Sequence, residues 1–128
     1  MAKILIIDDS LFQRRNIRKS LKAEGYDLQE ATTGREGLEM IPTFAPDCIV
    51  LDILMPEVDG LSFLRTLQAQ GNTTPVIVLT ADIQNTTRQE CLKLGAKEVL
   101  HKPLTRLDAE KLRAIIITIL DSVEEART

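Results

Sequence analysis

The sequence is poor in aromatic side chains and in long apolar runs. Its 128 residues include 3 Phe, 1 Tyr and no Trp, so it offers no aromatic platform for stacking nucleic-acid bases. A formal net charge of −3, without a basic tail, gives no sign of a nucleic-acid partner. The longest uncharged apolar run, residues 114–120, is interrupted by Thr118 and is too short to span a bilayer. We therefore expect neither a nucleic-acid nor a membrane partner.

Cysteine is scarce as well. Cys48 and Cys91 show neither metal-ligand nor redox-motif spacing, so we interpret both as reduced, buried packing residues. The N-terminus leads directly into an apolar run and lacks the layout of a signal peptide. These features favour the cytoplasm. The length suits one compact domain that spans residues 1–128.

Short apolar segments alternate with segments of helical periodicity. Such alternation predicts an α/β fold, in which a parallel sheet carries helices on both faces and the crossovers are right-handed. The predicted strands are residues 3–7, 27–31, 48–52, 76–80 and 99–101.

The segments between the predicted strands carry helix start and stop signals. The first helix is predicted to run from Ser10 to about Glu24, with its basic residues, Arg14 and Arg18 among them, on the exposed side. The expected caps of the later helices are Thr33, then Thr86 or Thr87, and then Thr105, which begins a long last helix. The expected ends are marked by Pro42 and Pro46 at the return to the sheet, by a stop before Gly71 and by a stop at Gly95.

Polar residues stand where four of these strands end. Asp52 follows the buried run of residues 48–51, Asp8 and Asp9 follow the first strand, and Thr80 and Lys102 end the fourth and fifth. The carboxyl ends of parallel strands share one edge of the sheet, where ligands bind. Clustered carboxylates repel one another, and a hard divalent cation such as Mg²⁺ relieves that repulsion. An ammonium and a hydroxyl beside the cation would suit a phosphoryl group.

Each of these residues also has an ordinary interpretation. Asp8 and Asp9 could be charges at a helix start, Lys102 a solvated lysine and Thr80 a β-branched strand residue. Their occurrence together at successive strand ends favours a site. His101, the only histidine, alternates with Lys102 and is predicted to point away from the acids, in a packing or surface role.

The whole set resembles the receiver domain of bacterial two-component response regulators, and most closely the stand-alone, chemotaxis-type (CheY-like) members. The resemblance rests on five motifs in order: Asp8-Asp9, Asp52 with Met55-Pro56, Asp59-Gly60, Thr80-Ala81 and Lys102-Pro103. It implies a flavodoxin-like, doubly wound (βα)5 fold with the strand order 2-1-3-4-5.

The resemblance also implies roles. Asp52 would accept a phosphoryl group from a sensor histidine kinase, and Thr80 and Lys102 would bind the phosphoryl oxygens. Mg²⁺ would be held by Asp8, Asp9, Asp52 and the carbonyl of Leu54. The Lys102–Pro103 peptide bond would be cis. The chain would be no enzyme beyond catalysing its own phosphoryl uptake and loss.

Phosphorylation would then act as a switch. The face of the fourth helix, fifth strand and fifth helix would change its affinity for an output or phosphatase protein. Val99 replaces the aromatic residue that often couples to the threonine in this family, so we expect the signal to pass through residues 81–86. An apolar stripe around Ile116 and Ile117 leaves open a monomer or a weak homodimer.

Two other functions compete with the switch. A Mg²⁺-dependent phosphohydrolase with an Asp nucleophile usually needs a second Asp two residues later, where this chain has Leu54. A receiver-like domain that only binds partners would not need the acids and the lysine that this chain retains.

Overall fold

The computed structural model describes residues 2–54, 59–82 and 84–127, so the Met55-Pro56 part of the motif lies outside the described residues. Five parallel strands form one sheet in the order β2-β1-β3-β4-β5, which confirms the predicted α/β topology. The strands are β1 (Lys3–Ile7), β2 (Asp27–Ala31), β3 (Cys48–Asp52), β4 (Val76–Thr80) and β5 (Glu98–His101). The fifth strand begins one residue earlier than predicted.

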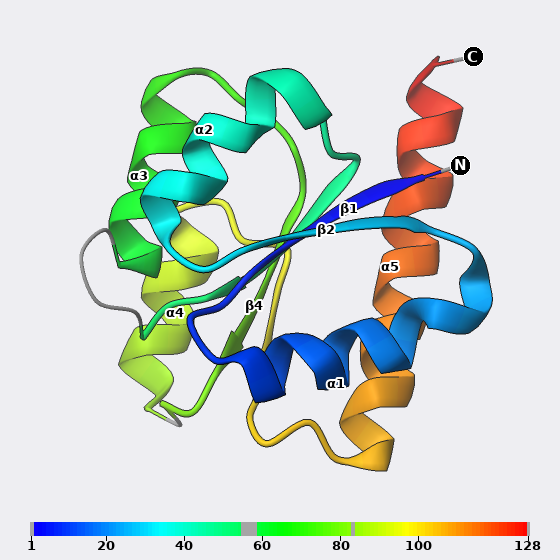
Figure 1. The fold of residues 1–128 in the computed structure, drawn as a ribbon. Helices are drawn as coiled ribbons and strands as arrows, with labels where there is room; N and C mark the ends of the chain where they lie inside the picture. The colour runs from blue at the N-terminus through cyan, green and yellow to red at the C-terminus, as the bar shows by residue number, and fades with distance from the viewer. Residues whose placement is uncertain (1, 55–58, 83, 128) are drawn as a thin grey trace.

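Helices cover both faces of this sheet. Figure 1 shows α1 and α5 on one face and α2, α3 and α4 on the other. Their bounds are α1 (Leu11–Leu21), α2 (Gly34–Phe44), α3 (Gly60–Ala69), α4 (Asn85–Lys93) and α5 (Arg106–Arg127). Within the described part of the chain, no helix is long and apolar enough to cross a membrane.

The sheet separates two apolar cores, because successive strand residues point to opposite faces. Leu5 and Ile7 of β1 belong to the core under α2, α3 and α4, whereas Ile4 and Ile6 belong to the core under α1 and α5. Every residue of β3 and β4 is buried, as expected of central strands in a parallel sheet. Cys48 and Cys91 are buried and free, which confirms their interpretation as packing residues.

Three predicted helix caps are confirmed. The hydroxyls of Ser10, Thr33 and Thr105 accept hydrogen bonds from the backbone N–H groups of Gln13, Glu36 and Asp108. Each bond satisfies one N–H group that the first helical turn leaves without a partner.

Two details of the helices differ from the prediction. The first α-helix ends at Leu21 and continues as a 3₁₀ turn, η1 (Lys22–Glu24), before Gly25 adopts a left-handed conformation at φ 73°. Pro42 lies inside the last turn of α2 instead of ending it; the helix ends at Phe44, and Ala45 follows at the C-cap, where its N–H donates to the Ile41 carbonyl. Pro42 has no N–H to donate to the carbonyl four residues earlier, which disfavours proline inside a helix, and α2 ends two residues after it.

The predicted cap of α4 is wrong. The helix starts at Asn85 with Gln84 at its cap position, so Thr86 and Thr87 already lie in its first turn. The Thr87 hydroxyl instead donates to a carboxylate oxygen of Asp82 at 2.7 Å. A side chain five residues earlier, in the preceding loop, therefore accepts the hydrogen bond of this threonine, which does not act as the cap.

Candidate functional site

Three acids meet at the carboxyl edge of two neighbouring strands, β1 and β3. Asp52 is the last residue of β3, and Asp8 and Asp9 follow β1, its direct neighbour in the sheet. One carboxylate oxygen from each lies within 4.8 Å of the others. Asp8 and Asp52 are almost fully buried, while Asp9 is exposed. Parallel register therefore brings together residues that are about forty positions apart in the chain.

Lys102 extends into this cluster from the end of β5. Its ammonium nitrogen lies 2.6 Å from Oδ2 of Asp8 and 3.2 Å from Oδ2 of Asp52. The Lys102 backbone N–H donates to the Thr80 carbonyl at 2.8 Å, which fixes the start of the loop after β5 beside β4. The Lys102–Pro103 peptide bond is cis. One amine thus contacts two acids across the end of β4.

Short turns orient the two buried acids. The second oxygen of Asp8 accepts the Ser10 N–H at 2.9 Å, and Oδ1 of Asp52 accepts the Leu54 N–H at 3.0 Å. Aspartate side chains commonly bond to the backbone two residues later, which closes the chain into a turn. Both carboxylates are therefore held by their own loops as well as by Lys102.

The charge balance of the cluster is unfavourable without a further cation. Burial raises the pKa of Asp52, whose side chain is only 4% exposed. The Leu54 N–H and the Lys102 ammonium oppose this rise, and the negative charge of Asp8 adds to it. A single ammonium cannot balance three carboxylates, so the cluster favours an additional positive charge.

The donor set fits Mg²⁺. All candidate side-chain ligands are carboxylate oxygens, which a hard cation prefers, and their mutual spacing of at most 4.8 Å is close to the span of one coordination sphere. Mg²⁺ usually retains several waters, so part of the set can bind it through water. The set contains no thiolate or imidazole, the ligands that would favour zinc or copper.

Thr80 is fully buried at the end of β4, between the strands that carry Asp52 and Lys102. Its hydroxyl oxygen accepts the Asp82 N–H at 3.0 Å. Within the described residues, the structure records no hydrogen bond from Thr80 to the three acids. The hydroxyl therefore lies at the carboxyl edge of the sheet, the edge that carries the acids. It is the acceptor in the bond with Asp82, so that bond does not use its hydrogen.

The sequence interpretation missed Arg14. Its position among the basic residues of α1 predicted an exposed side chain, but Arg14 is only 8% exposed. It donates to the Asp8 carbonyl and pairs with Glu30 of β2. The spacing from the Ser10 cap places Arg14 in the first turns of α1, close to the end of β1. Its second partner, Glu30 on β2, is set only by the tertiary fold.

The remaining predicted residues lie around this edge. Val99 is buried in the core under α2, α3 and α4. His101 is exposed, so of the packing and surface roles predicted for it the structure favours the surface role. Leu54, the predicted carbonyl ligand, has a side chain that is 54% exposed. Ile117 is exposed on α5, whereas Ile116 is buried.

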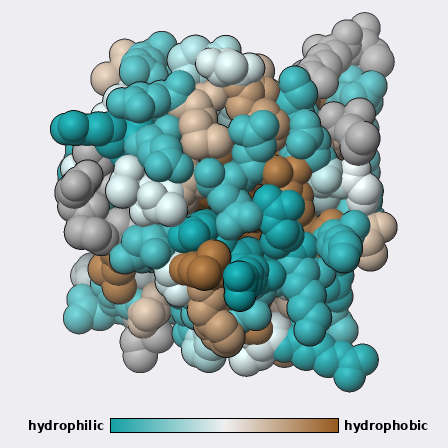
Figure 2. Space-filling view, in the orientation of Figure 1, coloured by the Kyte–Doolittle hydropathy of each residue, from teal (hydrophilic) through white to brown (hydrophobic). Residues whose placement is uncertain are grey.

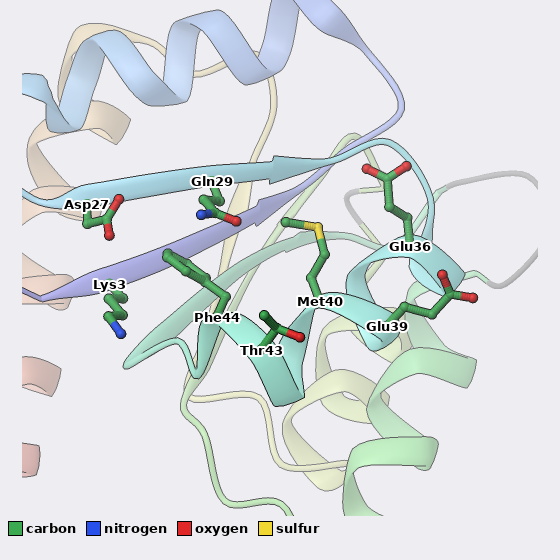
Figure 3. A pocket seen from close by; sticks show the side chains of 8 residues that line it. All are labelled: Lys3, Asp27, Gln29, Glu36, Glu39, Met40, Thr43 and Phe44. Atoms are coloured by element: carbon green, nitrogen blue, oxygen red, sulfur yellow. The ribbon is translucent and has the colours of Figure 1, made fainter.

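A separate pocket of about 400 Å³ lies along the outer strand β2, away from this cluster. Figure 3 shows Asp27 and Gln29 of β2 opposite Met40 and Phe44 of α2. None of its lining residues belongs to the predicted site. The acids and the lysine therefore form a site of their own at the carboxyl edge.

Comparison with known sequences gives one consistent result. A family model described as the response regulator receiver domain matches residues 4–117. The response regulator MprA of Mycolicibacterium vanbaalenii is 41% identical over 101 residues, which cover 79% of this chain and 44% of the relative. MprA of Mycobacterium leprae is 39% identical over 118 residues, which cover 92% of this chain and 50% of the relative. The chain thus spans half or less of the length of these curated relatives.

Solved structures resemble the chain over nearly its whole length. The receiver domain of Francisella response regulator 1452 is 32% identical, with a TM-score of 0.88, and the match covers 96% of this chain and 99% of that one. The chemotaxis protein CheY4 of Vibrio cholerae is 30% identical, with a TM-score of 0.82, and the match covers 93% of this chain and 98% of that one.

Proposed function

This chain belongs to the response regulator receiver domain family, and from that membership we propose that it is a phosphorylation-controlled signalling switch whose phosphoacceptor is Asp52. The observation that carries the proposal is the Lys102 amine, held 2.6 Å from Asp8 and 3.2 Å from Asp52 at the ends of three different strands. That arrangement provides a carboxylate nucleophile, a fixed positive charge and further acids for a cation in one place.

The proposed reaction is a phosphoryl transfer from a phosphohistidine. A carboxylate oxygen of Asp52 attacks phosphorus, the new P–O bond forms and the P–N bond breaks. The imidazole leaves with the electron pair of that bond. Lys102 would stabilise the negative charge of the transferring group, and the Thr80 hydroxyl would donate to one of its oxygens after turning from Asp82.

We assign the cation site to Asp8, Asp9, Asp52 and the carbonyl of Leu54. Bound Mg²⁺ would neutralise charge on the transferring phosphoryl oxygens. The chain's own contribution is to hold the acids, through the Ser10 and Leu54 N–H groups, before the cation arrives. Such pre-orientation lowers the free-energy cost of assembling the site.

The exposed apolar side chains around the site support a protein as the natural phosphodonor. A donor that reaches a carboxylate with 4% exposure must also contact the residues around it. Leu11, Phe12 and Leu54 expose large apolar side chains, and Figure 2 shows an apolar patch over the N-terminal end of α1 on a mostly hydrophilic face. Covering such a patch favours association. We propose a sensor histidine kinase as this donor.

The proposed output is a change in affinity at the face of α4, β5 and α5, for an output or phosphatase protein. A route toward α4 exists, since Asp82 accepts the Thr87 hydroxyl and donates its N–H to Thr80. Movement of Thr80 toward a phosphoryl group would change both bonds. Chemotaxis is one setting for such a switch, and the cytoplasm is its proposed compartment. Residues 4–117, matched by the family model, support one receiver domain as the unit of this activity.

The phosphohydrolase alternative gains nothing from the geometry. Its second acid would stand at Leu54, whose side chain is apolar and exposed. No carboxylate occupies that position to protonate a leaving group. We therefore propose that catalysis by this chain is confined to its own phosphoryl uptake and loss.

The test uses a small phosphodonor, such as acetyl phosphate, with Mg²⁺ and intact-mass measurement. We expect the wild-type protein to gain one phosphoryl group, and the Asp52→Asn protein to gain none because it lacks the nucleophile. Asp121→Asn, an exposed change on α5, is the matched control and should be phosphorylated normally. Uptake by Asp52→Asn would move the acceptor to another residue, and no uptake by any of the three would contradict the proposed switch.

A further inference from the structure

Arg14 connects the acid cluster to the outer strand of the sheet. Its Nη1 donates to the carbonyl oxygen of Asp8 at 2.7 Å, and its Nε lies 2.9 Å from Oε1 of Glu30 on β2. The residue is 8% exposed, so little water competes for these bonds. A buried guanidinium therefore bridges the end of β1 to the neighbouring strand.

The carbonyl that Arg14 contacts belongs to the peptide unit joining Asp8 to Asp9. A peptide unit is planar, so a bond to its carbonyl fixes the direction in which the chain continues to Asp9. The carboxylates on either side of this unit are two of the three in the cluster. One guanidinium thus constrains the backbone of both acids without touching either carboxylate group in the recorded bonds.

We propose that Arg14 is a positioning residue for the cation site, which holds the Asp8–Asp9 peptide so that both carboxylates can serve one Mg²⁺. The inference rests on the proposed function, because it assigns a residue to that same site. Mg²⁺ demands near-ideal octahedral geometry, and groups that orient its ligands strongly affect its affinity.

Glu30 orients the guanidinium of Arg14 and also pairs with the neighbouring Arg18. Each carboxylate oxygen of Glu30 pairs with one arginine, at 2.9 Å to Arg14 and 2.8 Å to Arg18. Arg18 donates its remaining recorded bond to the Leu28 carbonyl, at 3.3 Å, and its side chain is 43% exposed. Arg18 therefore shares the acid and the helix with Arg14 but not the contact to Asp8, which makes it a matched control.

Positioning and simple charge predict effects of opposite sign. A positive guanidinium near the cluster repels a cation, so its removal would strengthen Mg²⁺ binding if charge alone mattered. Loss of positioning would weaken binding. A lysine keeps the charge but lacks the planar fork that reaches two acceptors at once, so it separates the two effects.

The experiment measures Mg²⁺ affinity by isothermal titration calorimetry on the full chain. Wild type, Arg14→Met, Arg14→Lys and Arg18→Met are compared, and circular dichroism verifies that each is folded. We expect both Arg14 variants to bind Mg²⁺ about 10-fold more weakly, and Arg18→Met to stay within about 2-fold of wild type. Phosphorylation by acetyl phosphate gives a second readout. Its half-saturating Mg²⁺ concentration should rise in the Arg14 variants, while the rate at saturating Mg²⁺ recovers.

The possible outcomes separate this inference from the proposed function. Unchanged or tighter Mg²⁺ binding in the Arg14 variants would overturn the positioning role, as would equal weakening in Arg18→Met. If Arg14→Met does not fold, Arg14→Lys decides by the same criteria. Absence of Mg²⁺ binding in the wild-type protein would instead contradict the proposed function itself.

Discussion

At the scale of single residues, the site depends on charges placed where water is scarce. Asp8, Asp52 and Arg14 are all buried, and each has partners of opposite charge or backbone dipoles. A buried charge without such partners would destabilise the fold by several kcal/mol. The same partners fix side-chain directions, so compensation of charge and precise orientation arise from the same bonds.

Glu30 shows how such a network depends on pH. Burial alone would raise the pKa of Glu30, but hydrogen bonds and charges from Arg18 and Arg14 outweigh it and lower that pKa. The folded state therefore holds the Glu30 proton less tightly than the unfolded chain. Its stabilising contribution is present above the ordinary glutamate pKa and is lost as the pH falls through the lowered value.

We expect Glu30→Gln to lower the free energy of unfolding at neutral pH by about 1–2 kcal/mol, because Gln lacks the charge that pairs with two guanidinium groups. The difference from wild type should shrink on acidification, as Glu30 of the wild type becomes protonated. Urea denaturation at a series of pH values would measure it. Glu39→Gln, at an exposed position of α2, should stay within about 0.5 kcal/mol of wild type. A difference that does not change with pH would contradict the assigned cause.

At the scale of elements, close packing between the loop after β3 and the start of α3 shapes the rim of the site. Gly60 is the first residue of α3, and its N–H donates to the Ile53 carbonyl at 3.2 Å. A Cβ at Gly60 would overlap the backbone and side chain of Ile53. Glycine therefore allows the helix to approach the loop that begins at Asp52 and contains Leu54.

Gly60→Ala is expected to lower the free energy of unfolding by about 2–3 kcal/mol, since the backbone of Ile53 cannot move aside cheaply. Gly37 provides the control. A Cβ there meets the far end of the Ile7 side chain instead of backbone, and alanine favours the helix interior. Gly37→Ala should change the stability by less than about 1 kcal/mol. Equal midpoints of urea denaturation for the two variants would show that the overlap at Gly60 is relieved.

At the scale of the whole molecule, the fold gathers groups from distant parts of the chain. The acids follow β1 and β3, Thr80 ends β4 and Lys102 follows β5. All strands run the same way, so these groups share one edge. A cation bound there would contact segments from two strands and stabilise their arrangement in the folded state alone.

Mg²⁺ is therefore expected to raise the melting temperature. A ligand at about ten times its dissociation constant adds about 1.4 kcal/mol of stability, or a few degrees for a chain of this size. Asp9→Asn should lose most of this shift, because it removes an exposed ligand without disturbing the core. Thermal unfolding monitored by circular dichroism would measure it, with NaCl at equal ionic strength as the control. A shift that NaCl reproduces, or that Asp9→Asn retains, would argue against a specific site.

The sequence by itself determined the alternation of strands and helices, the buried central strands and the polar residues at their ends. These features depend on hydrophobic periodicity and on capping residues, which act over a few positions. The caps at Ser10, Thr33 and Thr105 were predictable for that reason. The strand order came from resemblance to a family, because local patterns do not specify which strands pair.

Only the tertiary structure decided the contacts between distant segments. The burial of Arg14 and the paired contacts of Lys102 each depend on partners from other strands: Glu30 for Arg14, and Asp8 with Asp52 for Lys102. A local pattern indicates which residue types stand at a strand end or on a helix. Whether their charges meet depends on the packing of elements that lie far apart in sequence, and that packing is a property of the whole fold.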